Sequence, residues 1–363
     1  MLQSAPRVGT GKTAPAGGIN EKTAWEDQDM AVWAKGWRMA TAAKRAPIGA
    51  AFGAALLASS AALATEAGRN PFPNGLNGIG VGNLPPPGLY LANEFIFIEA
   101  DRFNNSNGDR LFPNFKLETQ AYAARFLYSP GIKVLGADWY TQLIIPVVRV
   151  SIKNPPPPIP PGLPPPVAAG LAAAFSAPPF GRQSKTGVGD ITITQLLGWH
   201  SPNFHQAVGF DITFPTASFE ASRLVNIGQG YFTFAPAYAF TWLINGFELS
   251  SKFTLDVNFE NSETNYDSGE AFLVDYSFGH RWELNWGKVF VGIGGYYYHQ
   301  FTDDEVNGVQ FLDGFRGRAL GIGPQVQYQH PIGAVVELKY QRDYAVENRP
   351  EGDRIIGRLL VRF

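Results

Sequence analysis

The chain lacks cysteine entirely among its 363 residues. This absence excludes disulfide bonds, a thiolate nucleophile and metal centres that depend on cysteine ligands. Charged residues are also scarce, at 17% of the chain, and 29 Lys and Arg nearly balance 31 Asp and Glu. A nucleic-acid partner is therefore not expected, because proteins that bind nucleic acids usually carry a clustered excess of basic residues.

Long apolar runs are rare as well. Only residues 46–62, rich in Ala, Leu and Gly, approach the roughly 20 apolar residues that a membrane helix needs. Basic residues precede this stretch and Ala62-Leu63-Ala64 ends it, which is the order found in a secretory signal peptide. We expect residues 1–38 to be a spurious or disordered extension, residues 39–64 the signal peptide, and residues 65–87 a periplasmic leader or a plug.

From residue 88 onward apolar and polar residues alternate, which is the pattern of β-strands. The clearest example, residues 247–260, is longer than the ~5–6 residues of an ordinary soluble strand and fits a tilted membrane strand. The sequence predicts strands over 89–100, 115–128, 138–151, 188–200, 204–214, 231–243, 247–260, 270–282, 288–301, 318–329, 334–346 and 353–363. These segments predict an all-β fold, a transmembrane antiparallel up-and-down barrel of about 12 strands over residues 88–363.

The connecting segments favour the same fold. Short turns, of which Asn245-Gly246 is the clearest, alternate with mostly longer polar loops. Asn-Gly favours a type I′ hairpin, and short turns at one end with long loops at the other are typical of outer-membrane barrels. A secreted β-sandwich or soluble barrel is the alternative, and the strand lengths and the aromatic content of 13% fit it less well.

The last predicted strand ends the chain on an aromatic residue. Phe363, Val361 and Leu359 share its apolar face, while Arg354, Arg358 and Arg362 share the other. This ending looks like the C-terminal signal read by the machinery that inserts barrels into the bacterial outer membrane. We expect that machinery, outer-membrane lipid and lipopolysaccharide to be partners of this chain.

Several motifs occur in an order shared with a known family. They are Leu84-Pro85-Pro86-Pro87-Gly88-Leu89-Tyr90, Gly187-Val188-Gly189-Asp190-Ile191, Gly294-Gly295-Tyr296-Tyr297-Tyr298 and Glu347-Asn348-Arg349-Pro350-Glu351-Gly352-Asp353. Through them, the chain resembles the outer-membrane family named for the meta-pathway of phenol degradation. The resemblance covers about residues 70–363 and implies a barrel with a role in the uptake of aromatic compounds.

One departure from the family is the proline-rich segment 154–179. Its prolines predict an extended polyproline II segment in an external loop, because proline has no N–H group to pair in a sheet. Its role is open among a stiff lid over the pore, a segment that docks a partner and a tolerated insertion. Its apolar end, residues 167–175, is a candidate to pack into the barrel mouth.

The inward face of the predicted barrel carries charges of both signs. The candidate pore-lining residues are Glu248, Lys252, Asp256, Asp275, Glu337, Lys339, Gln341, Asp343, Arg354, Arg358 and Arg362. Such residues either line a water-filled lumen or pair with one another across it.

The sequence thus predicts a channel for passive uptake of small, aromatic or otherwise hydrophobic solutes across the bacterial outer membrane. A structural or adhesive barrel is the main alternative. An enzyme of the outer-membrane lipase type, using His200 and Ser201, is less favoured because both residues lie near a predicted periplasmic turn. The five histidines show no metal-binding spacing, so neither a metal nor another cofactor is expected.

Overall fold

The computed structural model describes residues 70–176 and 180–363. The predicted extension (1–38) and signal peptide (39–64) lie outside these residues. Within the described ranges, no helix is long and apolar enough to cross a membrane.

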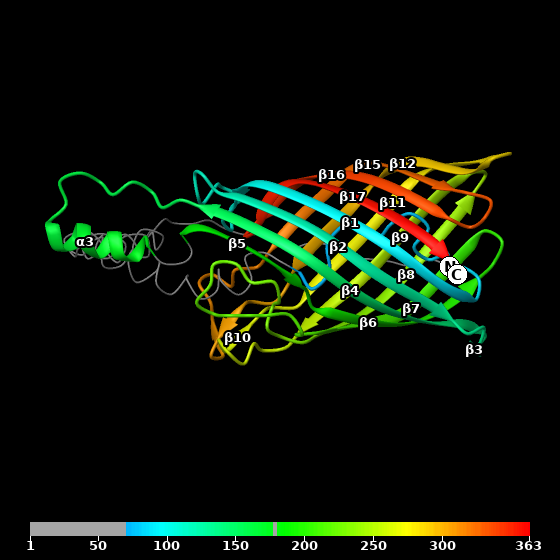
Figure 1. The fold of residues 1–363 in the computed structure, drawn as a ribbon, viewed down its shortest axis with the longest axis horizontal. Coiled ribbons are helices and arrows are strands. Elements are labelled where there is room, and N and C mark those ends of the chain that lie inside the picture. Colours follow the sequence, from blue (N-terminus) through cyan, green and yellow to red (C-terminus); the bar gives the residue numbers. More distant parts are fainter. Residues whose placement is uncertain (1–69, 177–179) are drawn as a thin grey trace, which may run out of the picture. The chain divides into compact units, whose positions relative to one another are not determined.

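The described residues form a closed antiparallel barrel of twelve strands, as the alternation predicts. β1 (Gly88–Phe103) closes the barrel by pairing with β17 (Pro350–Arg362), from Tyr90↔Arg362 to Phe103↔Pro350. The tilted strands and the closing pair are visible in Figure 1. The other strands of the wall are β2 (Lys116–Ser129), β4 (Ala137–Asn154), β5 (Gly181–Val188), β6 (Ile191–His200), β7 (Phe204–Phe214), β8 (Thr233–Ile244), β9 (Phe247–Asn258), β11 (Ala271–Leu284), β12 (Gly287–Gln300), β15 (Arg318–Gln329) and β16 (Val335–Glu347). β5 and β6 pair with β4 one after the other, so they share one of the twelve positions.

Alternation along each strand places one set of side chains outside and the other inside the barrel. β16 shows this most clearly: its outward residues Val336 and Leu338 are 49% and 54% exposed, whereas Glu337 and Lys339 between them are 5% and 1% exposed. Apolar side chains therefore cover the outside and charged ones fill the inside, the reverse of a soluble protein.

The connections differ in length between the two ends of the barrel. At the short-turn end, Asn245 and Gly246 both have positive φ, as the type I′ turn requires. At the long-loop end, three short strands, β10 (Tyr266–Asp267), β13 (Glu305–Val306) and β14 (Val309–Gln310), form a small separate sheet over the loops. The remaining strand, β3 (Lys133–Val134), pairs with β4 in the turn after β2.

Two details differ from the prediction. The fourth predicted strand, 188–200, is β6, which begins at Ile191, and a further strand, β5, precedes it in a stretch that was predicted to be a loop. The proline-rich segment contains a helix, α3 (Pro165–Ala174), which has a proline in its first turn and no buried residue. The expectation that residues 167–175 pack into the mouth is therefore wrong for the helix, although Phe175 contacts Phe180, with ring centroids 5.2 Å apart.

Glycines let β11, β12 and β15 approach closely. A Cβ atom on Gly295 would lie 1.8 Å from the carbonyl oxygen of Gly321, far inside van der Waals contact. We expect Gly295→Ala to destabilise the barrel by about 1–3 kcal/mol through overpacking. The loss is measured as a lower temperature for the heat-induced shift of the refolded barrel on a gel. The control is Gly170→Ala in α3, where a Cβ meets no atom within 4 Å, and an equal loss there would contradict this explanation.

Candidate channel and lumen

A segment without regular secondary structure runs along the inside of the barrel. Residues 70–87, here called the lumen segment, begin at the long-loop end, where the side chain of Asn70 accepts a hydrogen bond from Arg349 at 2.8 Å. They end at the short-turn end, where the carbonyl of Pro87 accepts one from Arg362 at 3.1 Å. The prediction of a leader or a plug for residues 65–87 stays a prediction.

Carboxylates of the wall bind the N–H groups of the lumen segment. Asp275 on β11 accepts a hydrogen bond from the Gly75 amide at 2.8 Å and two more from the backbone and side chain of Asn77. Glu248 on β9 accepts one from the Gly80 amide at 2.7 Å. These N–H groups of the lumen segment thus have hydrogen-bond partners although the segment is not part of a β-sheet.

Cations of the opposite wall bind the carbonyl groups of the same segment. Lys339 donates to the carbonyl oxygen of Leu76 at 2.8 Å, and Arg358 donates to the same oxygen at 3.1 Å. Arg354 donates to the carbonyl of Asn74 at 2.9 Å. The segment is thus held between acidic strands on one side and basic strands on the other.

The charged side chains inside the barrel also form ion pairs between strands of the wall. Glu94 on β1, which is fully buried, accepts from Arg125 and from Arg358, both at 3.0 Å. Arg358 also pairs with Glu337 at 3.1 Å. Removing an ionised carboxylate from water costs free energy, and the two arginines on Glu94 offset that cost. Further pairs are Asp343 with Arg354, Glu248 with Arg281, and Asp211 with Lys252.

The predicted pore-lining residues therefore lie on the inside of the wall, and most of them bind the lumen segment or one another. Gln341 donates to the carbonyl of Gly75, Asp256 is 4% exposed on β9, and Arg362 is exposed at the short-turn end. Their role in a pore stays a prediction. The prediction omitted Glu94, Arg125, Asp211 and Arg281, which also point inward. Their position in the alternation of β1, β2, β7 and β11 was the signal for including them.

Two chambers lie on either side of the lumen segment. The chamber nearer the long-loop end has a volume of about 220 Å³ and a mostly apolar lining. Its wall residues include Ile96, Ile98, Ala121, Ile144, Val148 and Val150. We call it the apolar cavity.

The chamber nearer the short-turn end is larger, about 600 Å³, and its lining includes Arg125, Lys252, Arg281 and Arg358. Leu76 lines the apolar cavity and Asn77 lines the second chamber, so the lumen segment separates the two. The Glu94–Arg125–Arg358 cluster reinforces this partition. We therefore expect a solute that passes along the barrel to displace part of the lumen segment.

The loops at the long-loop end pack together in a hydrophobic cluster that is rich in aromatic residues. Its buried members include Phe103, Phe112, Phe115, Phe180, Ile227, Tyr266, Phe311 and Phe315. Beside it, the carboxylate of Asp304 accepts hydrogen bonds from Tyr266, from Gln300 and from the Gly269 amide. Burial nevertheless dominates and raises the pKa of Asp304 to about 6.

The residues of the possible lipase site do not form a catalytic pair. The hydroxyl of Ser201 donates to the carbonyl of Phe204 at 2.7 Å and accepts from the amide of that residue, so it stabilises the turn. The ring of His200 instead contacts that of His205, with an Nδ1–Nδ1 distance of 3.1 Å.

An apolar exterior, a closed barrel and a charged interior define a transmembrane β-barrel of the bacterial outer membrane. The chain belongs to the family described as "MetA-pathway of phenol degradation", whose model matches residues 100–359. This match confirms the family resemblance. In outer-membrane barrels the short turns face the periplasm, so the short-turn end of this barrel is the periplasmic end.

A solved structure shares the barrel fold. The chain is similar to an outer membrane channel from Pseudomonas putida, with a TM-score of 0.62 and 16% identity over 77% of this chain and 97% of that one. It also matches the β domain of the Bordetella autotransporter BrkA, with a TM-score of 0.45 and 11% identity over 76% of this chain and all of that one. No curated protein matches the sequence.

The lumen segment depends on Asp275. Replacing this residue with alanine removes three hydrogen bonds to a carboxylate, and bonds to charged groups contribute about 1.5–3 kcal/mol. We expect Asp275→Ala to raise the population of the state in which the lumen segment is displaced by about 10- to 100-fold. The open time in single-channel recordings should rise with it. The exposed loop variant Asp313→Ala is the control. An unchanged open time in a correctly folded Asp275→Ala barrel would contradict this role of the carboxylate.

The stability of the folded loops at the long-loop end should depend on pH. Because the pKa of Asp304 is higher in the folded loops than its ordinary value of 3.8, the folded loops bind the proton more tightly. Their stability is greatest below about pH 4 and falls as the pH rises through about 6. Hydrogen exchange at the Gly269 amide should therefore speed up over this interval beyond its intrinsic pH dependence. Asp304→Asn should abolish that extra acceleration, and its persistence in the variant would assign it to another group.

Proposed function

We propose that this protein is a passive channel for small, neutral, aromatic or otherwise apolar molecules. The apolar cavity carries the proposal, since a barrel lumen filled by charged residues has no structural need for an apolar chamber of this size. An apolar cavity of roughly 150 Å³ is known to bind benzene, so 220 Å³ accommodates a substituted single ring.

The surroundings of the cavity explain the preference for neutral molecules. Bringing an ion into an apolar chamber removes its hydration without replacing it, at a cost of several kcal/mol. The charged residues in its lining include Asp343 and Arg354, which already pair with one another at 2.9 Å. The cavity thus attracts molecules through burial of apolar surface rather than through charge.

The family match and the fold support a channel in preference to an enzyme, and the similar Pseudomonas putida protein is itself described as an outer membrane channel. The C-terminal strand supports insertion by the barrel machinery, because Leu359 and Phe363 are exposed on its outer face, at 39% and 72%. The apolar outer face of the barrel is the surface that lipid would contact.

Filling the cavity tests the proposal. Ala121 on β2 lines the cavity, and Ala124, three residues along the strand, points to the outer face. We expect Ala121→Trp to reduce toluene entry into vesicles at least about tenfold, equal to a barrier raised by about 1.4 kcal/mol. The vesicles carry lipopolysaccharide outside and phospholipid inside, and protein-free vesicles give the background.

Ala124→Trp is the matched control and should leave toluene entry unchanged. Equal entry through the Ala121→Trp and wild-type proteins, both correctly folded, would rule out the cavity as the solute site. Entry no faster than in protein-free vesicles would rule out the channel itself for this solute.

A further inference from the structure

Four basic side chains lie together on the outer face of the barrel near the long-loop end. Lys116 on β2, Lys153 on β4 and Arg182 on β5 form one row, because Lys153 is paired in register with both of the others. Arg149 lies four residues before Lys153 on the same face of β4. All four side chains are exposed, and we call them the basic patch.

The neighbours of these residues along each strand fix their outward direction. The two valines that flank Arg149 line the apolar cavity inside the barrel, and so does Leu117, which is next to Lys116. Gln183, next to Arg182, accepts a hydrogen bond from a loop amide at 2.7 Å. Because successive side chains of a strand point to opposite faces, the basic patch points out of the barrel.

Apolar side chains cover the outer face directly below the basic patch. Leu143 and Val147, which precede Arg149 on β4, and Tyr122 on β2 are exposed there. The stretch of β4 from Trp139 to Val147 covers about 20 Å of depth in a strand tilted by about 40°, close to the ~25 Å of a barrel's apolar band. The basic patch thus begins where the apolar band ends.

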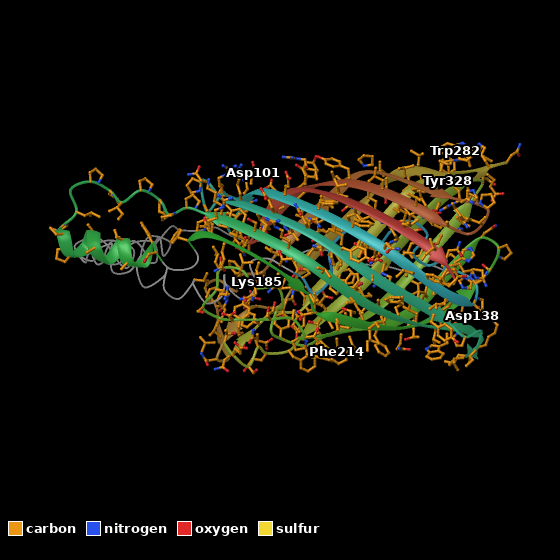
Figure 2. The ribbon with its side chains drawn as sticks, in the orientation of Figure 1. Asp101, Asp138, Lys185, Phe214, Trp282 and Tyr328 are labelled. Atoms are coloured by element: carbon orange, nitrogen blue, oxygen red, sulfur yellow. The ribbon has the colours of Figure 1, made fainter. Side chains whose placement is uncertain are left out.

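The basic patch belongs to the extracellular end of the barrel. Figure 1 shows β4 and β5 running to the long-loop end. Figure 2 shows Lys185, three residues after Arg182 on β5, near that end. Asp138, Trp282 and Tyr328 mark the opposite, short-turn end in the same view. Because the short turns face the periplasm, the basic patch lies at the level of the headgroups of the outer leaflet.

Neutral polar side chains complete this surface. Ser151 and Ser184 are paired between the basic row and Arg149, and Arg149 itself is paired with Gln120 on β2 and Thr186 on β5. Hydroxyl and amide groups donate hydrogen bonds to phosphate oxygens, and arginine binds phosphate with two parallel bonds.

The surface keeps a net positive charge. Glu118, opposite Ser151, is its acidic member, so four basic side chains against one acidic give a net charge of +3. Within residues 70–176 and 180–363, no acidic group forms an ion pair with any of the four basic side chains. By contrast, Arg358 inside the barrel is paired with Glu94 at 3.0 Å.

The row of three cations costs free energy while it has no counter-charge. Neighbouring strands lie about 4.8 Å apart, and like charges directly opposite each other destabilise a sheet. An anion that contacts several of these side chains at once removes that cost. Lipopolysaccharide forms the outer leaflet of the bacterial outer membrane and carries phosphate groups where its acyl chains begin, which is the level of the basic patch.

We propose that the basic patch is a binding site for the phosphate groups of one lipopolysaccharide molecule. The phosphates contact the row of Lys116, Lys153 and Arg182 and also Arg149, while the acyl chains lie against the apolar residues below them. The bound lipid holds β2, β4 and β5 together at the base of the proline-rich segment. This site is independent of the solute that the channel carries.

Binding of lipid A, the phosphorylated lipid part of lipopolysaccharide, to the refolded protein in detergent tests the site. Dissociation constants are measured by native mass spectrometry, with a chelator present so that no divalent cation links Glu118 to the lipid. Arg149→Gln with Lys153→Gln removes two exposed cations of β4. We expect it to weaken lipid A binding at least about tenfold, equal to about 1.4 kcal/mol.

The matched control removes the same charge at the other end of the barrel. Lys133 and Lys288 are exposed at the short-turn end, where they pair with Asp138 and Glu283. Surface pairs of this kind contribute little to stability, so Lys133→Gln with Lys288→Gln should fold and should leave lipid A binding unchanged. Equal weakening in both double variants would mean that the net charge of the protein attracts the lipid, and it would overturn the site.

Two further lipids identify the group that is bound. Lipid A from which the phosphates have been removed, and phosphatidylglycerol, should each bind the wild-type protein at least about tenfold more weakly than lipid A does. Equal affinity for the dephosphorylated lipid would assign binding to the acyl chains, and equal affinity for phosphatidylglycerol would assign it to anionic lipids in general. Either result would overturn the proposal.

A charge-conserving variant separates charge from folding. Arg149→Lys with Lys153→Arg keeps both cations and should bind lipid A within about twofold of the wild-type protein. A loss as large as that of the glutamine variant would contradict a site that acts through charge. The heat-induced shift on a gel verifies that each variant is folded before its affinity is compared.

Discussion

A charge inside a closed barrel has to be compensated by neighbours, because it has left water and the wall around it cannot supply hydration. Glu94 shows how completely this is done here, with two arginines on its carboxylate and no exposed surface. The same requirement explains the lumen segment. Asp275 and Lys339 complete their hydrogen bonds with backbone groups of residues 75–77 rather than with water. Charged wall and lumen segment thus depend on each other.

The composition of the lumen segment suits this role. Gly, Asn and Pro are common in residues 70–87, and such a stretch forms neither a helix nor a strand readily. Its N–H and C=O groups therefore remain available for the side chains of the wall. A segment bound by several separate side chains also differs from a strand of the sheet, since its contacts can be exchanged for water or solute without unzipping a ladder.

The barrel was largely predictable from the sequence, whereas the contents of its lumen were not. A two-residue period assigns every wall residue to one face, so the inward position of Glu337 and Lys339 followed directly from the pattern. Which groups they contact depends on the path of the lumen segment, and no periodicity encodes that path. β5 was missed because its sequence, Gly181–Val188, is almost entirely polar and none of its residues is buried, so it lacks the alternation of apolar and polar residues that marks the other strands.

The division of the lumen into an apolar cavity and a second chamber lined by more charged side chains bears on which solutes cross. On the proposed function, apolar solutes bind in the apolar cavity, and in the second chamber they also meet Arg125, Lys252, Arg281 and Arg358. A neutral ring that carries a hydroxyl group is a better fit to the whole path, because its ring is buried in the cavity while its hydroxyl replaces one hydrogen bond of the segment that it displaces. On the proposed function, solutes of this mixed character should cross fastest, since they are stabilised on both sides of the partition.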